Sequence, residues 1–535
     1  MHLEVEAKYE ADADVQLQDL VELVESVLAH EGASRADGPS WAEGDSRRER
    51  LRATYFDTAE LDLTTAGLTL RRRTGGSDAG WHLKVPGADR SRAEIRLPPG
   101  RGASRVPARL VTMTYAVTQG RELVPVVQID TDRTVQRLVD GTGQVLLEVA
   151  DDLVKARHLP PADGPGDLAP STSWREIEVE LVDGPPSLLD ALDPALRASG
   201  LAPARSASKL ARALDRTPAT RAGRSRASGP PTTATGKVSR KTARAGEIAL
   251  AHVTAQVDSI RAQDLPVRLD VPDAVHAMRV ASRRLRSALT TFAPLFDPAV
   301  AGPVRGELKW LAGVLGAARD AEVMRVRVTA AVEEERSDAR LDDSVPDDVG
   351  GELDNAYRAA HGEVLTQLDG ERYRALLDAL LALTEHPPLT DRARRPARKV
   401  LPRLVAKSDA RVRSSMRAAH TTHDPVRREE RLHSARKAAK QARYSAESVA
   451  PVFGKDARDF ALAMEKVQES LGDHLDSLNT RTLLHELASR TSRPSTAFTY
   501  GRLHALEDKH AERSRARVDE AWAAARKRRL RTWLR

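Results

Sequence analysis

Hydrophobic and polar residues alternate with two different periods in the two halves of the chain. Up to about residue 183, short segments rich in Val, Ile, Thr and Leu alternate with a period of two and are separated by Gly, Pro and Asp-Gly signals. From about residue 247 to 535 the period is helical, and Pro and Gly fall mostly at the joints between segments. The pattern therefore predicts an α+β protein with two domains, a sheet followed by an all-α domain.

The first half predicts an antiparallel sheet of eight strands with few long crossovers, which favours a closed β tunnel with flanking helices. Helices are expected at 15–31, 186–198 and 206–214, and we assign residues 1–214 to this domain. The strands are expected near residues 2–9, 48–57, 67–74, 80–86, 91–97, 122–138, 143–151 and 174–182.

Composition adds a linker and excludes some chemistry. Residues 215–246 hold eight Lys or Arg and one acid, so the net charge of this segment, +7, equals that of the whole chain. The segment lacks apolar periodicity. These residues are predicted to be a disordered basic linker.

The chain has no cysteine, which excludes disulfides, Cys-ligated zinc and cysteine nucleophiles. No signal-type segment and no run of 18 apolar residues occurs, so we expect a cytoplasmic protein without a membrane partner.

Ionisable residues of both signs recur at every second position on at least five strands. Glu4, Glu6 and Lys8 share one face of the first strand, because residues two apart in a strand point the same way. A single strand of this kind is usually the solvated face of an ordinary sheet. With both signs on several strands, the charges would instead line the interior of a closed sheet. Such an interior suits a metal-bound phosphate chain, since carboxylates hold Mg²⁺ or Mn²⁺ while Arg and Lys bind phosphate oxygens.

These residues resemble the CYTH superfamily, the triphosphate tunnel metalloenzymes. The resemblance covers residues 1–214 and rests on Glu4-x-Glu6-x-Lys8, the motif at 55–58 (Tyr-Phe-Asp-Thr), the arginine strand at 70–73, Lys84 and the closing strand at 176–180. The family includes inorganic, thiamine and RNA triphosphatases and class IV adenylate cyclases. The resemblance therefore implies hydrolysis of a triphosphate with Mg²⁺ or Mn²⁺ as cofactor.

The resemblance also implies roles for individual residues. The catalytic group would be Lys8, Glu4 and Glu6, with Lys8 as a base if neighbouring cations lower its pKa. Glu148 and Asp152 have the parity to face the interior, but Asp151 matches the family's acid equally well. The metal ligands would be Glu4, Glu6, Glu176, Glu178 and Glu180. The triphosphate ligands would be Lys8, Arg52, Arg71, Arg73, Lys84, Arg92, Arg133 and Lys209.

The helical half contains an internal repeat. The segment beginning at His276 matches the one beginning at His433 at an offset of 157, and Leu315-Gly316 matches Leu471-Gly472 at an offset of 156. We therefore expect two similar helical bundles, at about 247–400 and 401–535. In each copy a histidine leads basic residues along one helix face, opposite an apolar stripe. The predicted anion-binding residues are His276, Arg279, Arg283, Arg286, His433, Arg436, Lys437, Lys440 and Arg443.

This half resembles the CHAD domain, a helical module associated with binding inorganic polyphosphate along basic grooves. The combination predicts a hydrolase of inorganic triphosphate or short polyphosphate whose helical domain binds polyphosphate. The alternatives are a polyphosphate-binding scaffold without catalysis, and adenylate cyclase or thiamine triphosphatase activity in the same tunnel. Nucleic-acid binding is less favoured because only 4% of the residues are aromatic. The sequence does not indicate which oligomeric state the protein adopts.

Overall fold

The computed structural model forms two compact units, residues Met1–Pro231 and Thr232–Arg535. Each unit is described by itself. The described residues are 2–12, 15, 40–41, 47–86, 91–100, 105–139, 143–160, 171–184, 187–206, 208–215, 242–337 and 345–535.

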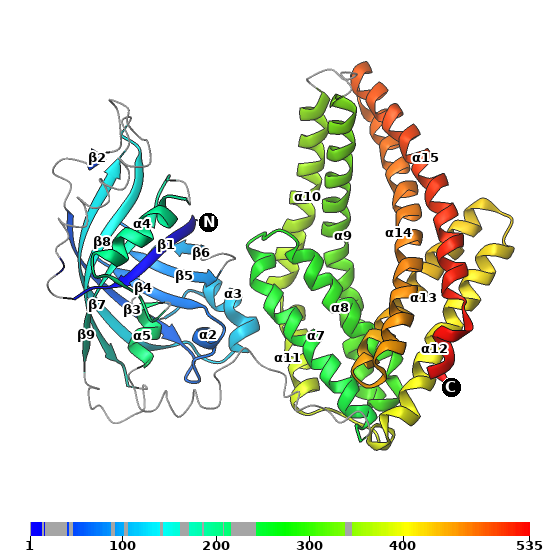
Figure 1. Cartoon of the computed structure of the whole chain (residues 1–535), viewed down its shortest axis with the longest axis horizontal. Coiled ribbons are helices and arrows are strands. Elements are labelled where there is room, and N and C mark those ends of the chain that lie inside the picture. The colour runs from blue at the N-terminus through cyan, green and yellow to red at the C-terminus, as the bar shows by residue number, and fades with distance from the viewer. Residues whose placement is uncertain are drawn as a thin grey trace. The chain divides into compact units, whose positions relative to one another are not determined.

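The N-terminal unit is built on one antiparallel sheet (Figure 1). Its order is β10-β1-β6-β5-β4-β3-β7-β8-β9, β2 pairs with β7, and β1 pairs with β9 as well as β6. The antiparallel sheet is confirmed, but its described part has ten strands, because β2 and β10 are too short to show an alternation. Closure into a tunnel stays a prediction. The strands are β1 (His2–Glu10), β2 (Ser40–Trp41), β3 (Arg47–Asp57), β4 (Thr69–Thr74), β5 (Gly80–Pro86), β6 (Ser91–Leu97), β7 (Val124–Val139), β8 (Val145–His158), β9 (Thr172–Leu181) and β10 (Ala202–Pro203).

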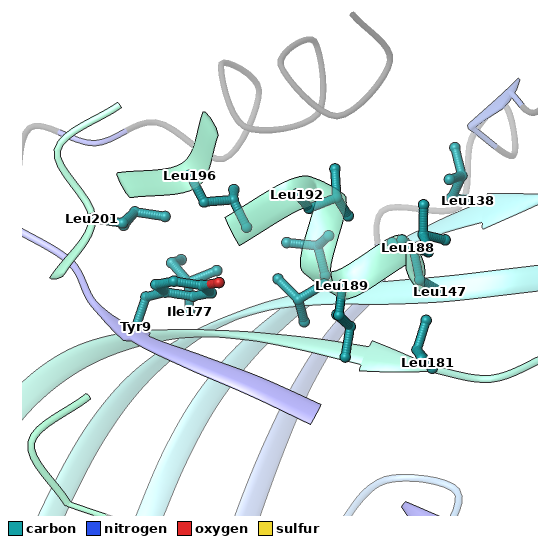
Figure 2. Packing of buried hydrophobic residues seen from close by; sticks show 12 residues of the cluster. Tyr9, Leu138, Leu147, Ile177, Leu181, Leu188, Leu189, Leu192, Leu196 and Leu201 are labelled. Carbon is teal, nitrogen blue, oxygen red and sulfur yellow. The ribbon is translucent and has the colours of Figure 1, made fainter. Parts of the chain in front are cut away.

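The apolar face of β9 is covered by helix α4 (Ser187–Ala198), which confirms the helix predicted at 186–198. Ile177 and Val179 are fully buried, and Figure 2 shows Ile177 beneath the leucines of α4, among them Leu189 and Leu192. Each such side chain contributes about 1.5–3 kcal/mol when it leaves water. This packing fixes the orientation of β9, so Glu178 and Glu180 point to the opposite face, where a cavity lies.

A second helix, α5 (Lys209–Asp215), packs inside the curve of the sheet. Leu210 and Leu214 contact a cluster that includes Tyr55 and Ile129, which also line the cavity. The helix predicted at 206–214 is thus present in shorter form, and its first residue, Lys209, reaches the cavity. The unit also holds α2 (Asp62–Thr65) and α3 (Ala108–Thr118).

Two predictions fall wholly or mostly outside the described residues. They are the helix at 15–31, of which only residue 15 is described, and residues 216–241 of the basic linker. The predicted linker extends slightly too far, because helix α7 begins at Ala245 and Arg244 forms a β-bridge with Pro396.

The C-terminal unit is helical, as predicted. Figure 1 shows α9 beside α10 and α14 beside α15. None of the described helices is long and apolar enough to cross a bilayer. The α-helices are α7 (Ala245–Arg268), α8 (Ala274–Thr291), α9 (Pro298–Ser337), α10 (Val345–Asp369), α11 (Glu371–Glu385), α12 (Ala397–Thr421), α13 (Pro425–Phe453), α14 (Lys455–Arg490) and α15 (Pro494–Ala525), with 3-10 turns η1 (Ala293–Leu295), η2 (Asp391–Arg394) and η3 (Arg528–Leu534).

The two copies of the sequence repeat each form an equivalent ion pair between neighbouring helices. Arg279 of α8 pairs with Asp320 of α9 at 3.3 Å, and Arg436 of α13 pairs with Asp476 of α14 at 3.1 Å. Gly472 leaves room for the second arginine, since a Cβ atom there would lie 3.0 Å from Arg436 Nη2. The predicted apolar stripe of α8 is buried along its length. Division into two similar bundles stays a prediction.

Asp57 of the 55–58 motif has a structural role. Its carboxylate is fully buried and accepts hydrogen bonds from the backbone N–H groups of Thr58, Leu63 and Thr64 and from the Thr64 hydroxyl, at 2.7–2.9 Å. The carboxylate therefore fixes the turn between β3 and α2, because a buried donor without a partner is costly. Asp57 thus supports the sheet from outside the cavity, whereas Tyr55 of the same motif lines it.

We expect Asp57→Asn to lower the free energy of unfolding of the N-terminal unit by about 2 kcal/mol, because an amide nitrogen cannot accept these hydrogen bonds. Urea unfolding, followed by hydrogen exchange of sheet peptides, measures the change. Asp130→Asn is the control, since Asp130 pairs with the exposed Arg52 and its loss should cost less than about 1 kcal/mol. Equal effects of the two substitutions would contradict the structural role.

Candidate functional site

The concave face of the sheet encloses a charged cavity of about 260 Å³. Every strand from β3 to β9 contributes to its lining, together with β1 and α5. Nine Lys or Arg and six Asp or Glu line it, so cations are in excess at the wall. The cations are Lys8, Arg47, Arg71, Arg73, Lys84, Arg96, Arg133, Arg137 and Lys209, and the acids are Glu6, Glu49, Asp78, Glu148, Glu178 and Glu180.

Glu178 is the centre of an ion-pair network at this wall. Its carboxylate oxygens lie 2.5 Å from Lys8 Nζ, 2.8 Å from Lys209 Nζ and 2.5 Å from Arg133 Nη2. Burial acts to raise the pKa of Glu178, but the charges of Lys209, Lys8 and Arg133 outweigh it and hold the pKa well below its usual range. The carboxylate is therefore ionised although it is buried.

Asp152 and Glu176 extend the network. Arg133 binds Asp152 with two parallel hydrogen bonds of 2.7 and 2.6 Å, and Lys209 lies 2.8 Å from Asp152 and 2.5 Å from Glu176. One oxygen from each of Asp152, Glu176 and Glu178 lies within 4.8 Å of the others. An all-oxygen donor set of this kind suits Mg²⁺ or Mn²⁺, so these residues fit a divalent cation.

Lys8 is a firmly protonated cation in this arrangement. Burial acts to lower its pKa, but Glu178 and Glu6, the latter 3.1 Å away, raise the pKa above the ordinary value. The expectation that neighbouring cations could make Lys8 a base is therefore wrong for this structure. Its geometry suits a hydrogen-bond donor to anionic oxygen.

The opposite wall carries Arg71 and Lys84, and Glu94 of β6 holds them together. The Glu94 carboxylate is fully buried and lies 3.8 Å from Arg71, 3.9 Å from Lys84 and 2.5 Å from Arg96. Burial acts to raise its pKa, but His82, Lys84 and Arg71 bring the pKa far below the ordinary value. His82 lies 2.9 Å from Glu94 and 2.8 Å from the backbone oxygen of Asp78.

Most predicted tunnel residues meet in the cavity. Those in the lining are Glu6, Lys8, Arg71, Arg73, Lys84, Arg133, Glu178, Glu180 and Lys209. Glu176 lies buried behind them. Glu4 and Arg92 are opposite each other in the β1–β6 register, and their side chains lie outside the described part of the structure.

The assignment of Arg52 was wrong. Its side chain is 63% exposed and pairs with Asp130, away from the cavity. Its neighbours Leu51 and Ala53 line the cavity, so the alternation of β3 sends Arg52 to the outer face. The same alternation brings Arg47 and Glu49 into the lining, and neither was predicted. Arg47 lies before the expected start of the strand at 48, whereas Glu49 lies within the expected strand and was given no role.

Asp152 was the open choice among the acids of β8. It is fully buried with Arg133 and Lys209, whereas Asp151 pairs with Arg175. The structure sets the parity of β8: the next residue, Leu153, is 57% exposed, and Asp152 points to the opposite, buried face.

The helical unit holds a second basic pocket, of about 230 Å³, between α8 and α13. Arg283 and Arg286 line it from α8, Lys437 and Lys440 from α13, and no acid contributes to the lining. Ser287, Thr290, Gln441 and Tyr444 complete it and were not predicted. Four of the nine predicted anion-binding residues thus form one pocket.

The other predicted basic residues have different surroundings. Arg279 and Arg436 pair with Asp320 and Asp476 as described above. Arg443 pairs with Glu447 and Glu465, both at 2.7 Å, so it does not belong to the pocket lining. His276 and His433 are exposed and also lie outside the lining.

Comparison with known proteins identifies both halves. The model of the CYTH domain matches residues 3–214, and that of the CHAD domain matches residues 251–485. The chain belongs to the CYTH–CHAD proteins. Two uncharacterized proteins from two strains of Mycobacterium tuberculosis are each 35% identical over 496 residues, which cover 89% of this chain and 90% of the relative.

Several solved structures match parts of the chain. PptA from Streptomyces chartreusis matches 52% of this chain and 100% of its own, with 22% identity and a TM-score of 0.44. The CHAD domain from Ricinus communis matches 53% and 93%, with 23% identity and a TM-score of 0.41. A Hippeastrum protein described as having a dominant triphosphatase activity matches 40% and 96%, with 16% identity and a TM-score of 0.22.

We expect Glu94→Gln to destabilise the CYTH unit by about 3 kcal/mol at pH 7, because it leaves buried cations without their counter-charge. The folded-state pKa of Glu94 is depressed, so its contribution is complete above the ordinary pKa of about 4.3 and is lost as the pH falls. The difference in unfolding free energy between wild type and variant should therefore shrink between about pH 5 and pH 3. A constant difference over that range would show that the charge of Glu94 is not what matters.

Proposed function

We propose that this CYTH–CHAD protein hydrolyses inorganic triphosphate or short polyphosphate with a divalent metal, and that its helical unit binds longer polyphosphate. The observation that carries the proposal is the cavity in which Glu178, backed by the buried Asp152 and Glu176, shares the lining with a basic wall. Triphosphatases and adenylate cyclases occur among CYTH proteins, so chemistry on a triphosphate is the common expectation.

Asp152, Glu176 and Glu178 are the residues proposed to hold Mg²⁺ or Mn²⁺, with Glu6 and Glu180 at the cavity side. When bound, the metal supplies charge neutralisation for the phosphate oxygens and the leaving group. In this structure Lys8, Lys209 and Arg133 occupy those carboxylates. Binding therefore requires an exchange of partners, in which the three cations turn to phosphate as the carboxylates turn to the metal.

The basic wall is proposed to orient the phosphate chain. Arg71 and Arg73 offer planar groups that match phosphate oxygens in pairs, and Lys84 adds a point charge. Arg71 and Lys84 are positioned by Glu94, so the wall is preorganised before substrate arrives. The attacking water needs a proton acceptor, and the carboxylates of Glu6 and Glu180 line the cavity for that role. Lys8 is proposed to donate a hydrogen bond to phosphate.

The helical pocket supports polyphosphate binding by its charge. Four cations converge there with no acid in the lining, and such a cluster is stabilised by a repeating anion. Linear polyphosphate offers one charge at every unit along the groove between α8 and α13.

The alternatives are a scaffold that binds polyphosphate without catalysis, and cyclase or thiamine triphosphatase activity. Cyclase action would release cyclic AMP and pyrophosphate instead of phosphate. A panel of tripolyphosphate, thiamine triphosphate, ATP and long-chain polyphosphate separates these functions in one experiment.

We predict metal-dependent phosphate release from tripolyphosphate, and a fall in kcat/KM of at least about 100-fold in both Glu178→Gln and Arg133→Ala. Arg52→Ala is the matched control, since Arg52 lies on the outer face of the same sheet, and its activity should stay within about twofold of wild type. Wild-type protein that releases no phosphate with Mg²⁺ or Mn²⁺ would favour the scaffold.

For the helical unit, Arg283→Ala should weaken binding of long-chain polyphosphate and reduce the slope of log K against log salt concentration by about one. The control is Arg372→Ala, because Arg372 pairs with Glu307 and lies over Trp310 away from the pocket. An unchanged slope in the Arg283 variant would place the polymer elsewhere.

A further inference from the structure

The two lysines of the helical pocket differ in their surroundings. Lys437 is exposed, whereas Lys440, one turn further along α13, is half-buried at the wall of the cavity. No carboxylate among the described residues forms an ion pair with Lys440. The nearest acid that acts on it, Asp476 of α14, is already paired with Arg436.

Apart from Asp476 of α14, the charged side chains that act on Lys440 are cations. Helix α8 presents Arg279, Arg283 and Arg286, and α13 itself presents Arg436 and Lys437. From α12, Arg411 donates a hydrogen bond to Gln441, the neighbour of Lys440 in the lining. An arginine remains charged in such surroundings, but a lysine can lose its proton. Lys440 is therefore the group in this pocket that can reduce the repulsion between neighbouring positive charges, by losing its proton.

We propose that binding of a phosphate chain in this pocket is coupled to the uptake of a proton by Lys440, so that the helical unit binds polyphosphate more tightly as the pH falls. This rests on the proposed binding function of the same pocket and adds its regulation. Burial and, after it, the charges of Arg283, Arg436 and Arg279 together lower the pKa of Lys440 to about 7. A bound phosphate chain raises the pKa of Lys440 again, because its negative charges neutralise the arginines and pair with the Lys440 ammonium.

The direction of the pH dependence follows from the protonation of Lys440 in the unliganded pocket and in the pocket with bound anion. Below about pH 7 the ammonium is present with or without the anion, and affinity does not depend on this group. Above about pH 7 the unliganded pocket has lost the proton, and binding must restore it. Affinity then falls with rising pH until the pH passes the higher pKa of the bound state.

The two histidines of the basic helices do not explain such a dependence. Burial and Arg319 lower the pKa of His276, and burial and Lys437 lower that of His433. Both rings are therefore neutral above about pH 6.5, the ordinary value. The window from pH 6.5 to 8.5 isolates Lys440.

The test is calorimetric titration of the full chain with long-chain polyphosphate at pH 6.5 and 8.5, without divalent metal. Two buffers of different ionisation enthalpy report the protons taken up. A long polymer has few end groups, so the ligand contributes little titration of its own. We expect the affinity of wild type to fall about tenfold between the two pH values, with proton uptake at pH 8.5. Lys440→Arg should show less than a threefold change and no uptake, because arginine keeps its charge.

Lys455→Arg is the matched control and should behave as wild type, because Lys455 pairs with Asp459 of α14 and does not line the pocket. The CYTH cavity is identical in all three proteins, so its contribution cancels. Lys440→Gln is the second variant: it should bind at both pH values about as weakly as wild type does at pH 8.5. The inference is overturned if Lys440→Arg keeps the wild-type pH dependence or proton uptake. Absence of wild-type binding at pH 6.5 would instead remove the proposed polyphosphate function itself.

Discussion

The N-terminal unit depends on one constraint, the mutual neutralisation of charges buried in a single cavity. Glu178 is in contact with three cations at once, and Asp152 and Glu94 are fully buried with cations on each side. A buried charge without a partner costs several kcal/mol, so each of these side chains holds the others in place. The sheet satisfies this requirement by covering its apolar outer face with α4, which turns the acidic face of β9 inward. Under the proposed function, these internal ion pairs are exchanged for a metal and a phosphate chain.

The helical unit has the opposite arrangement of charges. Its basic pocket has four cations at the wall and no acid, so the charges there are not neutralised internally. The neighbouring arginines that do have acidic partners, Arg279, Arg436 and Arg443, lie outside the lining. The pocket therefore has no acid of its own in its lining, whereas the cavity of the sheet has acids that pair with its cations. This contrast is consistent with one unit that captures a polyanion and another that acts on its phosphate units.

The helix that covers β9 was predicted as a helical segment after the sheet, and the roles of the cavity residues came from the family resemblance. Alternation along the chain predicted the sheet and which strand residues share a face, because a two-residue period fixes the face of each side chain once one face is buried. It failed at β3, where a start placed one residue late hid Arg47, and the resemblance put the outward-facing Arg52 in the site. The role of Glu94 was also missed, because its partners come from β4, β5 and β6 and meet only in the folded sheet. On the helices, periodicity found the basic face but not which arginines acquire acids from neighbouring helices, as Arg443 does from Glu465 of α14.

The central claim is that the carboxylates and the basic wall bind a metal and a triphosphate together. Because the two sets of charges now neutralise each other, neither ligand alone should bind as well as the two together. The most direct measurement is calorimetric binding of imidotriphosphate, a triphosphate with nitrogen bridges that resists hydrolysis, with Mn²⁺ and with a chelator. The account predicts that Mn²⁺ tightens binding at least about tenfold in wild type and gives no such gain in Glu178→Gln. Equal affinity with and without Mn²⁺ in wild type, or an undiminished gain in the variant, would contradict it.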